Sequence, residues 1–172
     1  ATDTWCGQFM TCSSLKRRGF TFEHILTCEP EDAAFAEKVE SFTRAVNAIS
    51  RFRGERILQV GTRPTAFESQ FFSEENLMHS FSQVLVPVDL ATAYERLDVI
   101  PPDDPDVLRV AAEIRGGADL ITDETPNSII NQARFERMLI GLAEEYHCRI
   151  IASSCWESLQ HRYNIAACST FS

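Results

Sequence analysis

The sequence contains little glycine or proline and no long hydrophobic run. Its 172 residues include only 7 Gly and 7 Pro, while 44% are hydrophobic and 24% are charged. This balance excludes disordered, collagen-like and low-complexity chains, and it is ordinary for a folded domain. No stretch approaches the roughly 20 apolar residues of a membrane-spanning helix, and no signal peptide is recognisable. The sequence therefore predicts a cytoplasmic protein without membrane contact.

Positively charged residues are also fewer than negatively charged ones. The 16 Lys and Arg are outnumbered by 25 Asp and Glu, which gives a formal net charge of −9. A surface of this sign repels the phosphate backbone of nucleic acids wherever the charge is not sharply segregated. Nucleic acid is therefore not an expected partner.

Motifs that mark several common enzyme classes are absent. The glycines form neither G-x-G-x-x-G nor a P-loop, and there is no G-x-S-x-G or H-E-x-x-H segment. The six cysteines make no C-x-x-C pair and the four histidines are scattered singly, so no metal-ligand cluster is evident. Free thiols are the favoured interpretation, because a chain of this length folds without disulfides. We expect this chain alone to bind neither a nucleotide nor a metal ion.

What the sequence does contain is an alternation of β-rich runs with helix-patterned segments. Strands are predicted over 22–28, 56–61, 84–88 and 149–152, with Pro87 indicating an edge or a strand end. Helices are predicted over 8–18, from Pro30 to just before Gly54, over 74–82, after Asp89, from Asp103 or Asp104 to Gly116, from Pro126 onward and over 156–163. This order predicts a doubly wound α/β fold, Rossmann-like or flavodoxin-like, with a mainly parallel sheet of at least four strands and helices on both faces.

We expect residues 1–172 to form a single α/β domain. The chain opens on Ala1 and closes on an uncharged segment, 166–172, unlike the polar tail on which many domains end. The sequence therefore indicates an excerpt of a longer parent protein.

Ligands of doubly wound sheets bind outside the carboxyl ends of the strands. The candidate ligand-binding residues near those positions are Gln8, Arg63, Phe67 and Trp156. Arg63 could hold a hydroxyl or a carboxylate of a ligand, or it could pair with Glu68. Trp156 could stack on the C–H face of a sugar or serve as a core anchor. Gln8 could present its amide to a ligand, although a glycine before a helix is also common for packing alone.

Three acidic residues are weaker candidates. Asp123, Glu124 and Glu157 could act as catalytic acids, but none has a partner residue at a spacing that would predict a catalytic pair. A capping or solvated role is favoured for them, so no catalytic residue is assigned within the chain.

The order of these motifs resembles the middle α/β domain of the L-fucose isomerase and L-arabinose isomerase superfamily. The resembling stretches span most of the chain. They are Trp5-Cys6-Gly7-Gln8 with Leu15-Lys16-Arg17, Pro30-Glu31-Asp32, residues 56–61 with Arg63-Pro64 and Phe67, residues 86–90, and Cys155-Trp156 followed by Cys168.

The resemblance implies a parent enzyme that isomerises an aldose to a ketose through an ene-diol. In that superfamily a divalent metal, typically manganese, polarises the carbonyl group. The resemblance also implies that the base and the metal ligands lie beyond Ser172, so that this chain alone is inactive. The implied partners are a small sugar substrate, the remaining domains of the parent enzyme and further copies in a homo-oligomer.

Two other functions fit the same pattern. A non-catalytic sugar-binding or regulatory α/β module would use the same sheet edge without chemistry, and a structural assembly domain would leave apolar surface uncovered. The most specific prediction is that Gln8, Arg63 and Trp156 converge on one sheet edge, which lines the substrate cleft of the parent enzyme.

Overall fold

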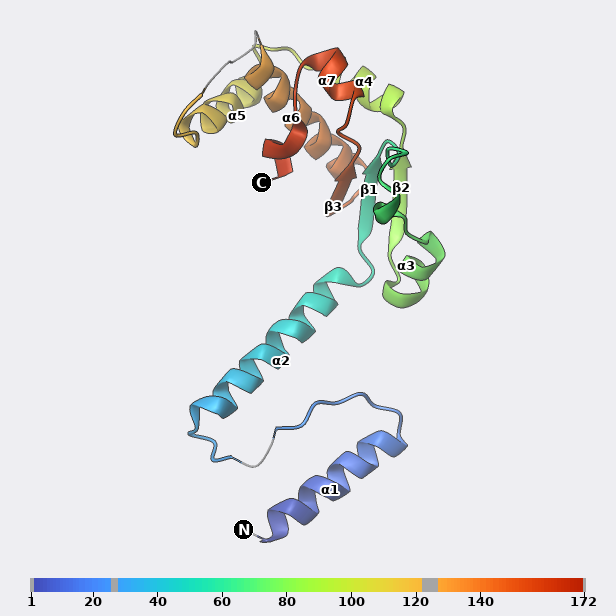
Figure 1. The fold of residues 1–172 in the computed structure, drawn as a ribbon, viewed down its shortest axis with the longest axis vertical. Helices are drawn as coiled ribbons and strands as arrows, with labels where there is room; N and C mark the ends of the chain where they lie inside the picture. Colours follow the sequence, from blue (N-terminus) through green and yellow to red (C-terminus); the bar gives the residue numbers. More distant parts are fainter. Residues whose placement is uncertain (1, 26–27, 122–126, 172) are drawn as a thin grey trace. The chain divides into compact units, whose positions relative to one another are not determined.

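The structure is a computed structural model that describes residues 2–25, 28–121 and 127–171 (Figure 1). The chain divides into two compact units, Ala1–Arg51 and Phe52–Ser172. The prediction of one domain over residues 1–172 stays a prediction.

The first unit contains helix α1 (Thr2–Arg17) and most of helix α2 (Ala33–Phe52). Gly19 follows α1 with a φ of +76°, in agreement with the predicted helix end. The strand predicted over 22–28 is wrong for its described part, because residues 20–25 form no regular secondary structure; residues 26 and 27 lie outside the described residues. A β-rich run needs a neighbouring strand to complete its hydrogen bonds, and the described part of this unit contains no strand.

The second unit is built on a parallel sheet of three strands. They are β1 (Arg56–Val60), β2 (Val84–Val88) and β3 (Ile150–Ser153), in the order β2-β1-β3. The three corresponding predicted strands are confirmed, and Pro87 does lie in an edge strand. The prediction of at least four strands is wrong for the part of the chain that the structure describes.

The predicted helices of the second unit are present in the same order. They are α3 (Glu74–Phe81), α4 (Leu90–Asp98), α5 (Pro105–Gly116), α6 (Ser128–Glu145) and α7 (Ser158–Tyr163), with 3₁₀ turns at η1 (Glu68–Gln70) and η2 (Ala167–Phe171). Asp89 caps α4 by accepting from the Thr92 amide at 2.9 Å. Asp104 caps α5 in the same way, so the choice left open between Asp103 and Asp104 falls on Asp104. Pro126, the predicted start of the long helix, lies outside the described residues.

The main hydrophobic core lies on one face of the sheet. Leu58 and Val60 of β1 are almost fully buried, and they belong to one cluster with Leu97 of α4 and with Phe135 and Leu139 of α6. The fold of this unit is therefore α/β, with a parallel sheet covered by helices on that face.

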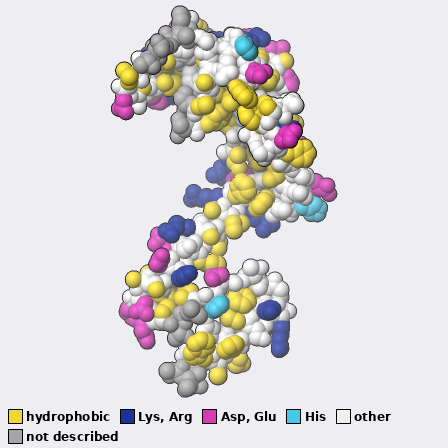
Figure 2. All heavy atoms as spheres, viewed as in Figure 1, with side chains coloured by type: hydrophobic (Ala, Val, Ile, Leu, Met, Phe, Trp, Pro, Cys, Tyr) yellow, Lys and Arg dark blue, Asp and Glu magenta, His cyan; other side chains and the backbone are white. Residues whose placement is uncertain are grey.

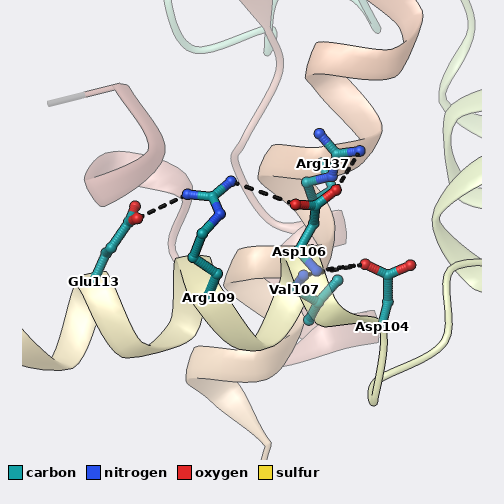
Figure 3. A network of polar contacts seen from close by, with 6 residues as sticks. All are labelled: Asp104, Asp106, Val107, Arg109, Glu113 and Arg137. Carbon is teal, nitrogen blue, oxygen red and sulfur yellow. Dashed lines mark hydrogen bonds and ion pairs between the residues drawn. The ribbon is translucent and has the colours of Figure 1, made fainter.

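Helix α5 packs against α6 through a second, smaller apolar cluster. A polar network borders it (Figure 3). Arg109 pairs with Glu113 at 2.7 Å and with Asp106 at 3.7 Å, and Arg137 of α6 reaches the same Asp106 at 3.3 Å. These exposed ion pairs contribute little individually, but the shared Asp106 links α5 to α6.

Candidate functional site

The candidate site lies where β1 ends at the carboxyl edge of the sheet. The Gly61 amide donates to the Val88 carbonyl at 2.8 Å, and the Ser154 amide donates to the Val60 carbonyl at 2.8 Å. Gly61 has a φ of +77°, and a Cβ placed on it would lie 2.9 Å from side-chain atoms of Leu90 and Ser154. The three strand ends are therefore joined tightly, and glycine is the residue type that fits at this turn.

A pocket of about 310 Å³ opens beside this edge. The polar side chains among its lining residues are those of Gln59, Arg63, Gln70, Ser153 and Ser154, together with Thr62. Its apolar wall includes Ile57 and Leu85, which belong to the strands themselves. An apolar pocket with a few convergent polar groups is the usual form of a small-molecule site.

Arg63 lies in the loop that follows β1 and lines this pocket. Its Nη1 donates to the Pro64 carbonyl at 3.1 Å and to the Thr65 carbonyl at 3.3 Å. Its guanidinium carbon lies 6.0 Å from the centre of the Phe71 ring. These contacts orient the guanidinium within its own loop. Both hydrogen bonds use Nη1, so Nε and Nη2 have no hydrogen-bond partner among the described residues and could donate to a ligand.

Phe67 and Trp156 come from different loops and stack on each other. Their ring centres are 4.8 Å apart and their planes meet at 23°. Phe67 is partly buried, whereas Trp156 remains 44% exposed, so Trp156 is not a core anchor. Two of the predicted site residues are thus brought together, although 89 positions separate them in the sequence (156 − 67).

The backbone next to Trp156 is strained. Glu157 has φ +64° and ψ −62°, and the Ser158 amide donates to the Trp156 carbonyl at 3.0 Å. This is the geometry of a γ-turn with positive φ, which is rare for a residue other than glycine. Such strain persists only when the surroundings hold it, and it is common in ligand-binding loops.

A cluster of polar side chains joins helix α7 to α4 and thereby fixes the γ-turn at Glu157. The Tyr94 and Ser158 hydroxyls lie 2.5 Å apart, the Tyr163 hydroxyl donates to Asp98 at 2.8 Å, and Arg162 pairs with Asp98 at 2.6 Å. Burial, together with the hydrogen bond to Asp98, raises the pKa of Tyr163 to about 12. The hydrogen bond from Tyr163 is the main reason that the pKa of Asp98 is lowered. Sequence reasoning missed this cluster.

Gln8 belongs to the other compact unit. Its Nε2 donates to the Ile25 carbonyl at 3.1 Å, so one donor of its amide serves the local structure. It also lines a mostly apolar pocket of about 270 Å³ with Trp5, Phe9 and His24, among others. The convergence of Gln8 with Arg63 and Trp156 stays a prediction.

The described residues do not fit a manganese site. Within the part of the chain that the structure describes, no three His, Cys, Asp or Glu side chains come close enough to hold a metal ion. Asp123 and Glu124 lie outside the described residues, and Glu157 occupies the γ-turn. The site as described can bind and orient a small polar molecule, and no metal-dependent step is assigned to it.

In comparisons with known proteins, no family model matches the sequence and no significant similarity to a curated protein is found. None of the described helices combines the length and the apolar character needed to cross a membrane.

Proposed function

We propose that this chain is a substrate-binding domain of a metal-dependent aldose–ketose isomerase, similar to the L-fucose and L-arabinose isomerases. The proposal includes a doubly wound sheet, a cytoplasmic parent enzyme that forms a homo-oligomer, and a sugar bound between this domain and the remaining domains. It rests on the motif resemblance and on the geometry at the carboxyl edge of the sheet.

The observation that carries the proposal is that the loop after β1, which contains Arg63, also contains Phe67, and that Phe67 stacks on Trp156 beyond the neighbouring strand β3. A sugar presents a hydroxyl-rich edge and an apolar C–H face. A guanidinium donates strong charge-assisted hydrogen bonds to such oxygens, and an exposed indole covers the apolar face. The hydroxyls of Ser153 and Ser154, in the wall of the pocket that Arg63 lines, add donors and acceptors for further sugar hydroxyls.

The residues of this chain bind and orient the substrate in this proposal. Because the described residues do not fit a metal site, polarisation of the carbonyl and proton transfer belong to other parts of the parent enzyme. The isolated chain is then expected to bind sugar weakly and to leave it unchanged.

A fluorescence titration tests the proposal. The chain contains two tryptophans, so a Trp5→Phe background makes Trp156 the only reporter. Since only part of the site is present, we expect L-fucose or L-arabinose to change the Trp156 emission with a Kd in roughly the millimolar range. Removal of Arg63 by Arg63→Ala should weaken binding by about tenfold or more, because a charge-assisted hydrogen bond contributes about 1.5–3 kcal/mol.

The matched control is Arg109→Ala, which removes an exposed arginine that is paired on α5, away from the sheet edge. This variant should bind sugar like the unchanged chain. Unaltered Trp156 emission at roughly 100 mM sugar, far above a millimolar Kd, would contradict the proposal. Equal losses of sugar affinity in Arg63→Ala and Arg109→Ala would contradict the assigned role of Arg63.

A further inference from the structure

The pocket beside the carboxyl edge of the sheet is positively charged. Among the described residues, Arg63 is the charged side chain in its lining, and no Asp or Glu lines it. The whole chain, by contrast, has a formal net charge of −9, and acidic side chains are scattered over the visible surface of both compact units (Figure 2). A cleft whose wall has one sign of charge concentrates ligands of the opposite sign, so this pocket favours an anion.

The charge of Arg63 is not neutralised by a carboxylate. No ion pair joins Arg63 to another residue in the part of the chain that the structure describes, so its alternative pairing with Glu68 is not formed. Arg109, Arg149 and Arg162, in contrast, each have a carboxylate oxygen at 2.6–2.7 Å. Arg63 therefore differs from these arginines in having no local counter-charge.

The free donors of Arg63 form one edge of its guanidinium. The bonds to the Pro64 and Thr65 carbonyls both use Nη1, which leaves Nε and Nη2 without a partner among the described residues. The N–H bonds of Nε and Nη2 that share this edge are parallel, and their spacing matches two oxygens of a carboxylate or a phosphate. The local contacts thus hold the guanidinium while leaving a two-donor edge for an anion.

Neutral hydrogen-bonding groups accompany this cation. The side chains of Thr62, Gln70 and Ser154 line the same pocket and make no hydrogen bond with another described residue. They can donate to and accept from the hydroxyls of a ligand. Ile57 and Leu85 supply an apolar wall. The lining therefore suits a small molecule that has several hydroxyls and one anionic group.

We propose that the ligand of this pocket is an anionic sugar, whose carboxylate or phosphate binds the Nε–Nη2 edge of Arg63. The inference rests on the proposed function, from which the sugar comes, and it adds the charge of the substrate. A neutral sugar fits less well, because it would shield Arg63 from water without supplying a counter-charge. A polyphosphate also fits less well, since one cation cannot balance several negative charges in an acidic protein.

Ligand-observed NMR titrations of the full chain test the inference with two matched pairs of ligands. L-fucose and L-galacturonate differ in one substituent, which is a methyl group in the first and a carboxylate in the second. L-arabinose is compared with its terminal phosphate ester. We expect the charged member of at least one pair to bind roughly threefold to tenfold more tightly, because Arg63 is partly solvated. The pair that shows this preference identifies the anionic group.

Two variants assign the preference to Arg63. Arg63→Gln removes the charge and should make the charged and neutral members of each pair bind equally. Arg109→Ala removes one positive charge from α5, away from the sheet edge, and should retain the preference. This control separates a contact with Arg63 from a general effect of net charge. Circular dichroism of each variant verifies that the fold is intact.

The outcomes separate this inference from the proposed function. Equal affinities within both pairs, or a preference that survives in Arg63→Gln, would overturn the inference and leave the sugar site standing. If no sugar binds at roughly 100 mM, the proposed function fails. Inorganic phosphate is then titrated alone: binding that Arg63→Gln abolishes would support the anion site by itself, and the absence of such binding would overturn the inference as well.

Discussion

Substitution of Gly61 by alanine should destabilise the second unit more than the same change at Gly54. Both glycines have positive φ, +77° at Gly61 and +74° at Gly54. They differ in their surroundings, because a Cβ on Gly61 would lie 2.9 Å from atoms of Leu90 and Ser154, whereas a Cβ on Gly54 meets no atom within 4 Å. The pair of variants therefore separates the backbone cost from the steric cost.

The magnitude follows from these two contributions. An alanine in the left-handed region costs about 1–2 kcal/mol at either position. Overpacking at Gly61 adds about 1–3 kcal/mol, because carbon atoms normally approach only to roughly 3.5–4.0 Å. Alanine also lowers the conformational entropy of the unfolded chain, and this offsets the destabilisation of both variants equally, by about 0.4–1 kcal/mol. Gly61→Ala should therefore be less stable than Gly54→Ala by about 1–3 kcal/mol.

Urea denaturation in the Trp5→Phe background measures this difference, since Trp156 then reports only on the unit that contains both glycines. The midpoint should fall further for Gly61→Ala while the slope with denaturant stays unchanged. Equal midpoints for the two variants would refute the close packing of the strand ends around Gly61.

Two further predictions concern the turn and the helix that follow β3. The pKa of Tyr163 is raised to about 12 from an ordinary value of about 10. The protonated Tyr163 hydroxyl therefore stabilises the fold fully below pH ~10, and this stabilisation is lost as the pH rises toward ~12. Urea denaturation at several alkaline pH values should show this loss in the unchanged chain and a smaller one in Tyr163→Phe; equal losses would contradict the assignment. Glu157→Gly should raise the free energy of unfolding by about 1 kcal/mol over Glu157→Ala, since glycine adopts the γ-turn without strain. A glycine variant no more stable than the alanine variant in the same assay would argue against strain at this turn.

Much of the second unit could be predicted because its signals are local. The apolar runs that became β1 and β2 end at a glycine and at a capping aspartate, and Pro87 indicated an edge or a strand end. Asp104 precedes Pro105 at the start of α5, which is the usual order of an N-cap and a first-turn proline. These features depend on neighbouring residues, so the sequence alone determines them.

The failures have a different origin. The run from Phe22 onward has strand composition, but a strand exists only with a partner, and partners are set by the tertiary fold. The contact of Tyr163 with Asp98 joins residues 65 positions apart, and no motif announces it. The γ-turn at Glu157 occupies a conformation that favours glycine, so the residue type itself argued against it.

The loops that contain Arg63 and Trp156 leave the sheet at the same edge because of the topology and the strand order. Parallel strands place their carboxyl ends on the same side, and the strand order makes β1 and β3 neighbours. Val60 pairs with Ser153 in the ladder, and Arg63 and Trp156 each lie three residues beyond their member of that pair. Sequence reasoning could supply the shared edge, whereas the placement of β3 beside β1 and the stacking of Phe67 on Trp156 depend on the tertiary fold, which only the structure reveals.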